Sequence, residues 1–476
     1  MSFTSLPFLP FIALLTIGYW LLIPKKASAQ NLLLLAAGLF FIAYNDWKAA
    51  IIIGLSGSLN FFLVQRMASM KEGAAKKWFF YGGCAWNLSL LVYFKYLQEI
   101  ITAIGIWIQS GTLDTTQLFL PLGISFFSFQ LVGYWIDVYN EETEPEDNFP
   151  AFLTYLFYFP KLISGPIERV QNLIPQLKTE RTFSAPATTD GLRQFLWGYF
   201  KKTVVSTHCL LFYKALYTQP ESMSGINLML AAVMNMVYIY ADFSGYSDMA
   251  CGVSKGLGIR ITNNFAFPFF AANISDFWKR WHISLTTWIM NYVYTPISFI
   301  LRKHHKIGTF VAILAAFTTV GVWHGIKSGY LIYGILQALF FVPLILQGRS
   351  MNGPSHQQKL SLSKITRMFG LFMLVCIAAL LFRPLPALTS MNEMTLIVTH
   401  LFQAPDFSAI SGITNGIYWF LIVACFAIEW INQNHDHGLD IARLHGSLRW
   451  CYYLFCILAI FFFSEFPNSG FIYAQF

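Results

Sequence analysis

The segment FTTVGVWHGIKSGY, residues 317–330, ends an apolar run with a histidine, His324, between a tryptophan and a glycine. A neutral imidazole tolerates burial better than a carboxylate does, and its ordinary pKa near 6.5 lets it take and return a proton at physiological pH. Gly321 and Gly325 leave room for a substrate or for backbone to come close. The pattern indicates proton transfer, although a lone buried histidine is also often a hydrogen-bonded structural residue.

Three more clusters place ionisable residues in apolar segments. YADFSGYSDMACG (240–252) holds Asp242 and Asp248, SDFWKRWHISL (275–285) holds His282, and PKLISGPIERV (160–170) holds Lys161. Such residues cost about 2.5–3.5 kcal/mol each inside a membrane, so they are functional candidates by default. Structural alternatives remain open: the two aspartates could cap helices or pair with Arg260, and Lys161 could be an anchor or an ion-pair partner.

Two histidine-rich stretches are weaker candidates. NHDHGLD (434–440) offers His435, Asp436 and His437, but no fourth ligand follows at a convincing spacing for zinc. We interpret this stretch, and KHHK at 303–306, as solvated loops. The chain has no Walker A sequence, no GxSxG elbow and no dinucleotide-binding fingerprint, so ATP-driven and serine-hydrolase chemistry lack their usual motifs.

The elements that must position these residues are apolar helices. The chain of 476 residues is 56% hydrophobic and 11% charged, and soluble domains carry roughly 25% charged residues. Apolar runs of membrane-spanning length recur along it. We expect spans near 7–24, 31–46, 48–65, 78–96, 98–110, 117–139, 192–216, 225–250, 308–323, 329–347, 366–383, 414–432 and 449–465.

Two regions do not fit simple spans. Residues 152–170 are interrupted by Pro160 and Pro166, and residues 263–300 mix tryptophans with charged side chains. Irregular backbone at membrane depth survives only where protein or a water-filled cavity satisfies its polar groups. Both regions therefore predict re-entrant or interfacial segments around an interior cavity.

The formal charge of +8 does not indicate a nucleic-acid partner, because the basic residues lie in short loops between apolar runs. Lys25 and Lys26 follow the first run, and Arg66 and Lys71 follow the third. The positive-inside rule places these loops in the cytoplasm and the N-terminus outside.

Five motifs follow one another as they do in membrane-bound O-acyltransferases: LPLGISFFSFQLVGYWIDVY (120–139), FYFPKLISGPIERV (157–170), YIYADFSGYSDMACGVSKGLGI (238–259), NNFAFPFFAANISDFWKRWHISLTTW (263–288) and GVWHG (321–325). The chain resembles the bacterial branch with alginate and peptidoglycan O-acetyltransferases and the teichoic acid D-alanyl transfer protein. The resemblance implies an all-α polytopic bundle of about 11 to 13 transmembrane helices, with re-entrant segments around a central tunnel. Residues 1–476 would form one domain, with core motifs at 117–345 and C-terminal helices at 364–470.

The resemblance also implies roles for individual residues. His324 becomes the catalytic general base that takes the proton of an attacking hydroxyl, and His282 its relay or orienting partner. Lysine or tryptophan N–H groups within 278–281 could stabilise the oxyanion, although an interfacial belt with snorkelling basic side chains would give the same pattern. Further substrate or tunnel-lining candidates are Trp278, Lys279, Arg280, Trp281, Trp323, Asp242, Asp248, Lys161 and Asn273.

Substrates and partners follow from the resemblance as well. It implies no bound cofactor or metal, an acetyl-CoA or acyl-carrier thioester as donor, and an exported or cell-wall polysaccharide as acceptor. It further implies a separate extracytoplasmic partner of the SGNH type and a place in the bacterial cytoplasmic membrane. Transfer of D-alanyl or another acyl group, a transporter with a proton path through His324, Asp242 and Lys161, and a catalytically silent scaffold remain alternatives.

Overall fold

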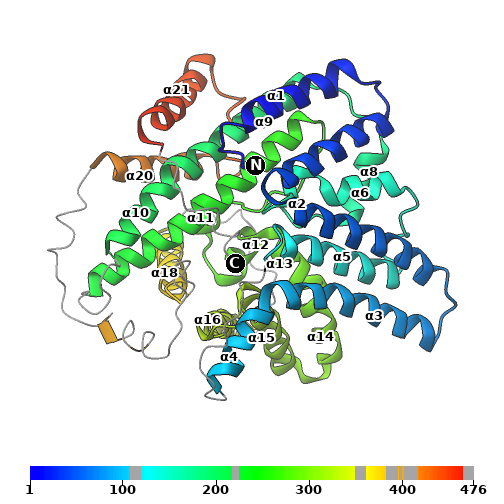
Figure 1. The fold of residues 1–476 in the computed structure, drawn as a ribbon. Helices are drawn as coiled ribbons and strands as arrows, with labels where there is room; N and C mark the ends of the chain where they lie inside the picture. The colour runs from blue at the N-terminus through cyan, green and yellow to red at the C-terminus, as the bar shows by residue number, and fades with distance from the viewer. Residues whose placement is uncertain are drawn as a thin grey trace. The chain divides into compact units, whose positions relative to one another are not determined.

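The structure is a computed structural model that describes residues 1–107, 119–216, 225–348, 361–381, 395, 399–400 and 416–464. Every regular element in these ranges is a helix (Figure 1). Six of these helices are long and apolar enough to cross a membrane: Ala27–Ala68, Gly225–Gly256, Arg302–His324, Ser328–Leu346, Leu362–Ala379 and Gly446–Phe463. The predicted all-helical membrane fold is confirmed. The ends of the spans expected at 98–110, 117–139, 366–383, 414–432 and 449–465 lie outside the described residues.

The chain divides into two compact units. The first contains residues 1–192 and 250–262, and the second contains residues 193–249 and 263–476. The boundary falls within two helices, α9 (Ala185–Phe200) and α11 (Gly225–Gly256), and between Thr262 and Asn263.

The first unit is built on α2, a helical segment over Ala27–Ala68 that is broken at Asp46 (φ −154°, ψ 82°). A Cβ atom on Gly38 would overlap the carbonyl oxygen of Phe157, and one on Gly54 would lie 3.8 Å from the ring of the same residue. Sixteen residues of straight helix would separate these glycines by about 24 Å. Helix α2 therefore folds back at Asp46, as expected from the predicted spans 31–46 and 48–65. The Asp46 carboxylate accepts a hydrogen bond from the Ala49 N–H and begins the second half.

Shorter helices complete the first unit, and several of them pack on α2. The predicted interruption at 152–170 is present as a break between α6 and α7, with Pro160 in the first turn of α7, where proline is tolerated. The elements are α1 (Phe8–Ile17), η1 (Gly18–Leu22), α3 (Ala74–Leu91), η2 (Val92–Tyr96), α4 (Leu97–Trp107), α5 (Ile124–Tyr139), α6 (Phe149–Phe157), α7 (Phe159–Leu162) and α8 (Val170–Lys178).

The second unit carries the region expected to be irregular, residues 263–300. Residues 263–282 contain two short helices joined by irregular segments, and residues 283–300 form one continuous helical stretch with a π-helical turn in its middle. The elements are η3 (Lys201–Ser206), α10 (Thr207–Leu216), η5 (Pro268–Phe270), α12 (Ile274–Arg280), α13 (Ile283–Ile289), η6 (Met290–Tyr294), α14 (Thr295–Ile300), η7 (Arg302–His304), α15 (His305–His324), α16 (Ser328–Leu339), α17 (Val342–Leu346), α18 (Leu362–Ala379), α20 (Gly416–Ile431) and α21 (Gly446–Phe463).

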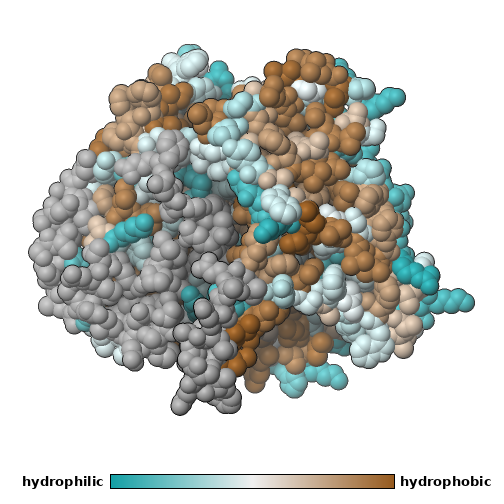
Figure 2. Space-filling view, viewed as in Figure 1, coloured by the Kyte–Doolittle hydropathy of each residue, from teal (hydrophilic) through white to brown (hydrophobic). Residues whose placement is uncertain are grey.

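Large apolar side chains remain on the outside of the helices. Leu21, Leu55, Phe369 and Phe461 are exposed, and much of the surface drawn in colour in Figure 2 is hydrophobic. Water would penalise so much exposed apolar area, whereas lipid tails do not. The surface agrees with an integral membrane protein.

Candidate functional site

His324 is the last residue of α15, and its side chain is buried. Two glycines allow α15 to lie directly against α16. A Cβ atom on Gly321 would be 2.4 Å from the Tyr330 carbonyl oxygen, and one on Gly334 would be 2.5 Å from that of Phe317. The space beside Gly321 is thus filled by the backbone of α16 rather than open to a substrate. This backbone contact fixes the end of α15 that carries His324.

His282 lies in the turn between α12 and α13 and adopts a left-handed backbone conformation (φ 46°, ψ 55°). That region is uncommon for a residue with a Cβ atom, so its surroundings must hold it there. Asn264 does so from outside the turn: its carbonyl accepts the Ile283 N–H at 2.9 Å and its side-chain oxygen accepts the Ser284 N–H at 3.1 Å. Asn264 is completely buried.

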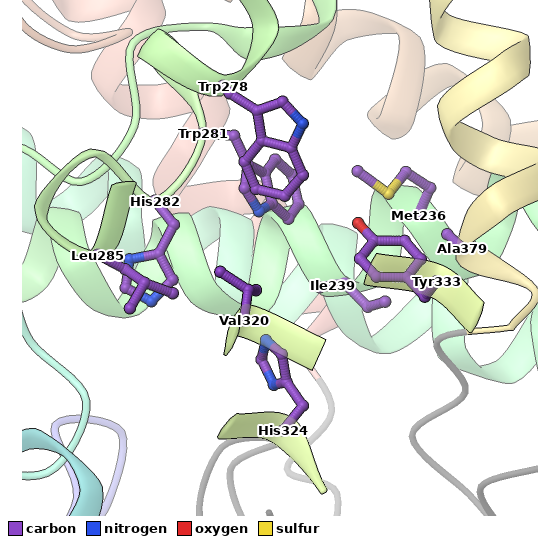
Figure 3. Close-up of a pocket in the computed structure, with 10 residues that line it drawn as sticks. All are labelled: Met236, Ile239, Trp278, Trp281, His282, Leu285, Val320, His324, Tyr333 and Ala379. Carbon is purple, nitrogen blue, oxygen red and sulfur yellow. The ribbon is translucent and has the colours of Figure 1, made fainter. Parts of the chain in front are cut away.

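The two histidines come from different segments and line the same cavity, together with Trp278, Trp281, Val320 and Tyr333. Figure 3 shows the two imidazoles on neighbouring parts of the wall, with the indoles above them. The cavity has a volume of about 20 Å³, which is the room that about one water molecule needs. Side chains of the wall must therefore move before an acyl group can enter.

Trp323 packs against both histidines. Its ring centroid lies 4.4 Å from that of His324 and 6.2 Å from that of His282. Trp323 is not among the residues that line the cavity. The tryptophan of GVWHG therefore contacts both imidazoles without lining the cavity.

The tryptophans of α12 and the following turn form the opposite part of the wall. The Trp278 indole N–H donates to the Gln337 side-chain oxygen at 3.2 Å, so in this conformation it is committed to α16. Trp281 packs edge to face on Phe265 at 5.1 Å. Of the oxyanion donors expected within 278–281, Trp278 already has another acceptor and Lys279 is exposed.

Other candidates of this segment do not line the cavity. Lys279 is exposed, and Arg280 is buried in an ion pair with Asp276 at 3.0 Å. Asn273 begins α12, where its side chain accepts the Asp276 N–H. Asn273 and the Arg280–Asp276 pair stabilise the short helix that carries Trp278 and directly precedes Trp281.

The two aspartates of α11 have lysine partners on η3. Asp248 pairs with Lys201 at 2.7 Å, and Asp242 pairs with Lys202. The alternative pairing with Arg260 was wrong, because close contact between α9 and α11 brings the two lysines to the aspartates instead. Neither aspartate lines the cavity.

Lys161 belongs to the first unit and is buried. Its ammonium group donates to the Gln130 side-chain oxygen at 2.7 Å and lies 4.4 Å from the Tyr155 ring centroid. Both contacts fit the anchoring role that the sequence left open for this residue.

The stretch 434–440 is only in part the solvated loop expected from its polar residues: Asn434 and Asp436 are exposed, whereas the residues that follow are mostly buried. His437 is buried, and the neighbouring Gly438 packs on the Trp197 indole, 2.4 Å from where a Cβ would stand. Among the described residues no three His, Cys, Asp or Glu side chains form a group that could hold a metal ion. The KHHK residues at 303–306 are exposed but helical, at the junction of η7 and α15.

The electrostatic setting of His282 follows from its burial. The turn lies outside the helices long enough to span a membrane, and burial lowers the pKa of this imidazole to about 3. His282 is thus neutral at physiological pH. It can donate or accept a hydrogen bond there, but it supplies no positive charge.

Several buried polar residues of the second unit were missed from the sequence. Glu429 is an acidic residue inside the apolar run GIYWFLIVACFAIEWI, and Lys201 lies in the predicted span 192–216. The rule that marks ionisable residues in spans as candidates could have found both. Asn264 and Gln337 carry no comparable signal, because an asparagine or glutamine is common in loops and helices alike.

The model of the membrane-bound O-acyltransferase family matches residues 146–382, a stretch that contains both cavity histidines. The chain is 33% identical to the probable alginate O-acetylase AlgI of Pseudomonas aeruginosa, over 64% of this chain and 59% of that protein. It is 30% identical to the peptidoglycan O-acetyltransferase of Helicobacter pylori, over 71% and 68%, and 29% identical to the teichoic acid D-alanyltransferase of Bacillus subtilis, over 46% and 57%.

The chain spans less than two thirds of the length of the Pseudomonas relative. The match to the Helicobacter protein covers more than two thirds of both proteins, and the family match includes α11, the two short helices around His282 and the α15–α16 pair. The chain is an integral membrane protein that belongs to the membrane-bound O-acyltransferase family.

Proposed function

We propose that this protein is an O-acyltransferase that moves an acetyl group from a cytoplasmic thioester for O-acetylation of an exported or cell-wall polysaccharide. The observation that carries the proposal is the convergence of His282 and His324, from separate segments, on one buried cavity. The names of the alginate and peptidoglycan relatives support an acetyl group and a polysaccharide.

His324 acts as the general base. It takes the proton from the acceptor hydroxyl while the hydroxyl oxygen attacks the thioester carbonyl carbon. The tetrahedral intermediate then collapses: the C–S bond breaks, the ester forms, and the imidazolium returns the proton to the departing sulfur. The reaction is balanced without any external acid or base.

His282 has a supporting role in this scheme. Because burial keeps it neutral, it orients the substrate or His324 through a hydrogen bond rather than by charge. Its left-handed turn, held by Asn264, presents the imidazole to the cavity. Trp323 keeps the two imidazoles at a fixed spacing.

The direction of transfer rests on the charge pattern and on α2. Lys25, Lys26 and Arg66 flank the two ends of the folded-back α2, and Asp46 forms its tip. By the positive-inside rule, the two ends of α2 lie on the cytoplasmic side of the bacterial inner membrane, and the tip lies on the outer side. A thioester would then enter from the cytoplasmic side, and an extracytoplasmic partner of the SGNH type would receive or use the acetyl group.

A second candidate is D-alanyl transfer by the same centre. It is favoured by the similarity to the teichoic acid D-alanyltransferase of Bacillus subtilis. The chemistry at His324 would be unchanged, and only the acyl group and its carrier would differ.

The test is an NMR analysis of surface polymer from cells with the gene, without it, and with the gene restored. We expect O-acetyl signals to disappear on deletion and return on complementation. Loss of D-alanyl esters instead would support the second candidate. An unchanged ester content in the deletion strain, together with solute flux into proteoliposomes lacking any acyl donor, would contradict an acyltransferase and favour a transporter.

A further inference from the structure

Helices α9 and α11 touch through two glycines within the second unit. A Cβ atom on Gly198 would lie 2.4 Å from the Gly245 carbonyl oxygen, and one on Gly245 would lie 2.7 Å from that of Gly198. Only residues without a side chain allow two helix backbones to approach this closely. The contact places the start of η3, at Lys201, beside the middle of α11.

Lys201 is the centre of a buried polar cluster. Its ammonium nitrogen lies 2.7 Å from an Asp248 carboxylate oxygen, 2.9 Å from the Ser244 hydroxyl and 3.5 Å from a Glu429 carboxylate oxygen. Lys201 is the first residue of a π-helical turn, a feature that is frequent at functional sites. Lys201 and Glu429 are both almost completely buried.

Glu429 enters the cluster from α20. A carboxylate within an apolar helix is costly unless it is paired and hydrogen-bonded. The Tyr240 hydroxyl of α11 points at it and lies 2.8 Å from each carboxylate oxygen. The Lys201 ammonium group lies 5.2 Å from the centroid of the same tyrosine ring. Tyr240 is thus held at its hydroxyl end by α20 and at its ring by η3.

The ring of Tyr240 also reaches the wall of the catalytic cavity. Its centroid lies 4.8 Å from that of Phe269, 5.7 Å from that of Phe265 and 6.2 Å from that of Trp281. Trp281 lines the cavity and directly precedes His282. A continuous set of contacts therefore leads from the Glu429 carboxylate through Tyr240 to the residue beside the second histidine.

We infer that Glu429 is a positioning residue for acyl transfer, acting through Tyr240 on Trp281 and the His282 turn; this inference rests on the proposed function. Glu429 lies beyond residues 146–382, the stretch that matches the family. Helix α20 then helps to hold the wall of the cavity in place, so residues 146–382 alone do not complete the active cavity. Misplacement of a reacting group by about 1 Å can cost on the order of 100-fold in rate.

The test uses the full chain, purified and reconstituted, with the extracytoplasmic partner, radiolabelled acetyl-CoA and oligosaccharides from de-esterified surface polymer. Tyr240→Phe removes only the hydroxyl, and we expect kcat to fall about 10- to 100-fold with little change in KM. Glu429→Gln keeps an oxygen that can accept the tyrosine hydrogen bond and should retain more activity than Glu429→Leu. Tyr238→Phe is the matched control, because Tyr238 is a buried tyrosine two residues earlier on α11, and it should leave kcat unchanged.

The three changes Lys201→Met, Asp248→Asn and Glu429→Leu, made together, separate positioning from stability, because they remove every charge of the cluster. Replacing a buried ionic cluster as a whole by uncharged groups is often neutral for folding, and the amide oxygen introduced by Asp248→Asn can still accept the hydrogen bond of Gln194. This triple variant should therefore unfold near the temperature of the parent protein and yet lose kcat as Glu429→Leu does. Carbethoxylation of His282, followed by mass spectrometry, should become faster in it and in Tyr240→Phe.

Parent-like kcat in both Tyr240→Phe and the triple variant would overturn the inference while leaving the proposed function intact. A parent protein that transfers no acetyl group would instead refute the proposed function; the carbethoxylation rates would still report whether Glu429 holds the His282 turn.

Discussion

The α carbon of Gly321 on α15 lies so close to the Tyr330 carbonyl of α16 that an added Cβ atom would be 2.4 Å from the oxygen. The contact lies one turn of helix before His324. It fixes the catalytic end of α15 through backbone packing, which is less adaptable than packing between flexible side chains.

Gly321→Ala should therefore displace α16 or the end of α15. Overpacking of this kind typically costs about 1–3 kcal/mol, and we expect a lower unfolding temperature in detergent together with a loss of acyl transfer. Gly370→Ala in α18 is the control, because nothing lies within 4 Å of a Cβ atom at that position. If Gly321→Ala behaved like Gly370→Ala in both measurements, the close packing of α15 on α16 would not matter for the site.

Asn264→Ala should loosen the turn that carries His282. The substitution removes the side-chain acceptor of the buried Ser284 N–H, and the loss of such a hydrogen bond costs about 1–3 kcal/mol. We expect reduced acyl transfer and faster carbethoxylation of His282. Asn263→Ala is the matched control, since the Asn263 side chain accepts from Gln194 instead. Equal effects of the two substitutions would show that Asn264 has no special influence on the turn.

The stability of the protein should depend on pH through His282. Its pKa is about 3 in the folded protein and 6.5 in the unfolded chain, so the unfolded chain binds the proton first as the pH falls. Above about pH 6.5, protonation of His282 does not change the free energy of unfolding. Below that pH the unfolded chain takes up the proton, and the free energy of unfolding falls until about pH 3. Between pH 7.5 and pH 5 the loss is about 2 kcal/mol.

This pH effect can be isolated by comparing unfolding temperatures of the parent protein and His282→Gln across that interval. The variant should show a shallower decline because glutamine does not titrate. Parallel curves would mean that His282 does not remain neutral in the folded protein.

Much of the helical framework was predictable from apolar length. The break between the expected spans 31–46 and 48–65 appears at Asp46, where two apolar runs meet at a polar pair. The irregular regions at 152–170 and 263–282 are indeed broken into short helices, whereas residues 283–300 form one continuous helical stretch. Pro160 predicts the break in the first region, and tryptophans mixed with charged side chains predict that the second region is no simple membrane span.

The contacts that complete the site were not predictable in the same way. Lys201 meets Asp248 only because two glycines far apart in the sequence let α9 and α11 touch, and periodicity within one helix does not reveal its crossing partner. The same holds for Asn264. Its two oxygens accept hydrogen bonds from the backbone N–H groups of Ile283 and Ser284, about twenty residues later in the chain. Lys279 and Arg280 are adjacent basic residues, yet helical geometry sends one outward and the other into an ion pair.

The most direct test of the account is the rate of acetyl transfer by His324→Ala in the reconstituted system. His305→Ala is the matched control, because His305 is an exposed histidine at the other end of the same helix. General base catalysis contributes about 100- to 10,000-fold, so His324→Ala should be slower by at least about 100-fold while it remains folded and inserted, and His305→Ala should match the parent protein. A folded His324→Ala protein that transfers acetyl groups at the parental rate would contradict the assignment of His324 as the base.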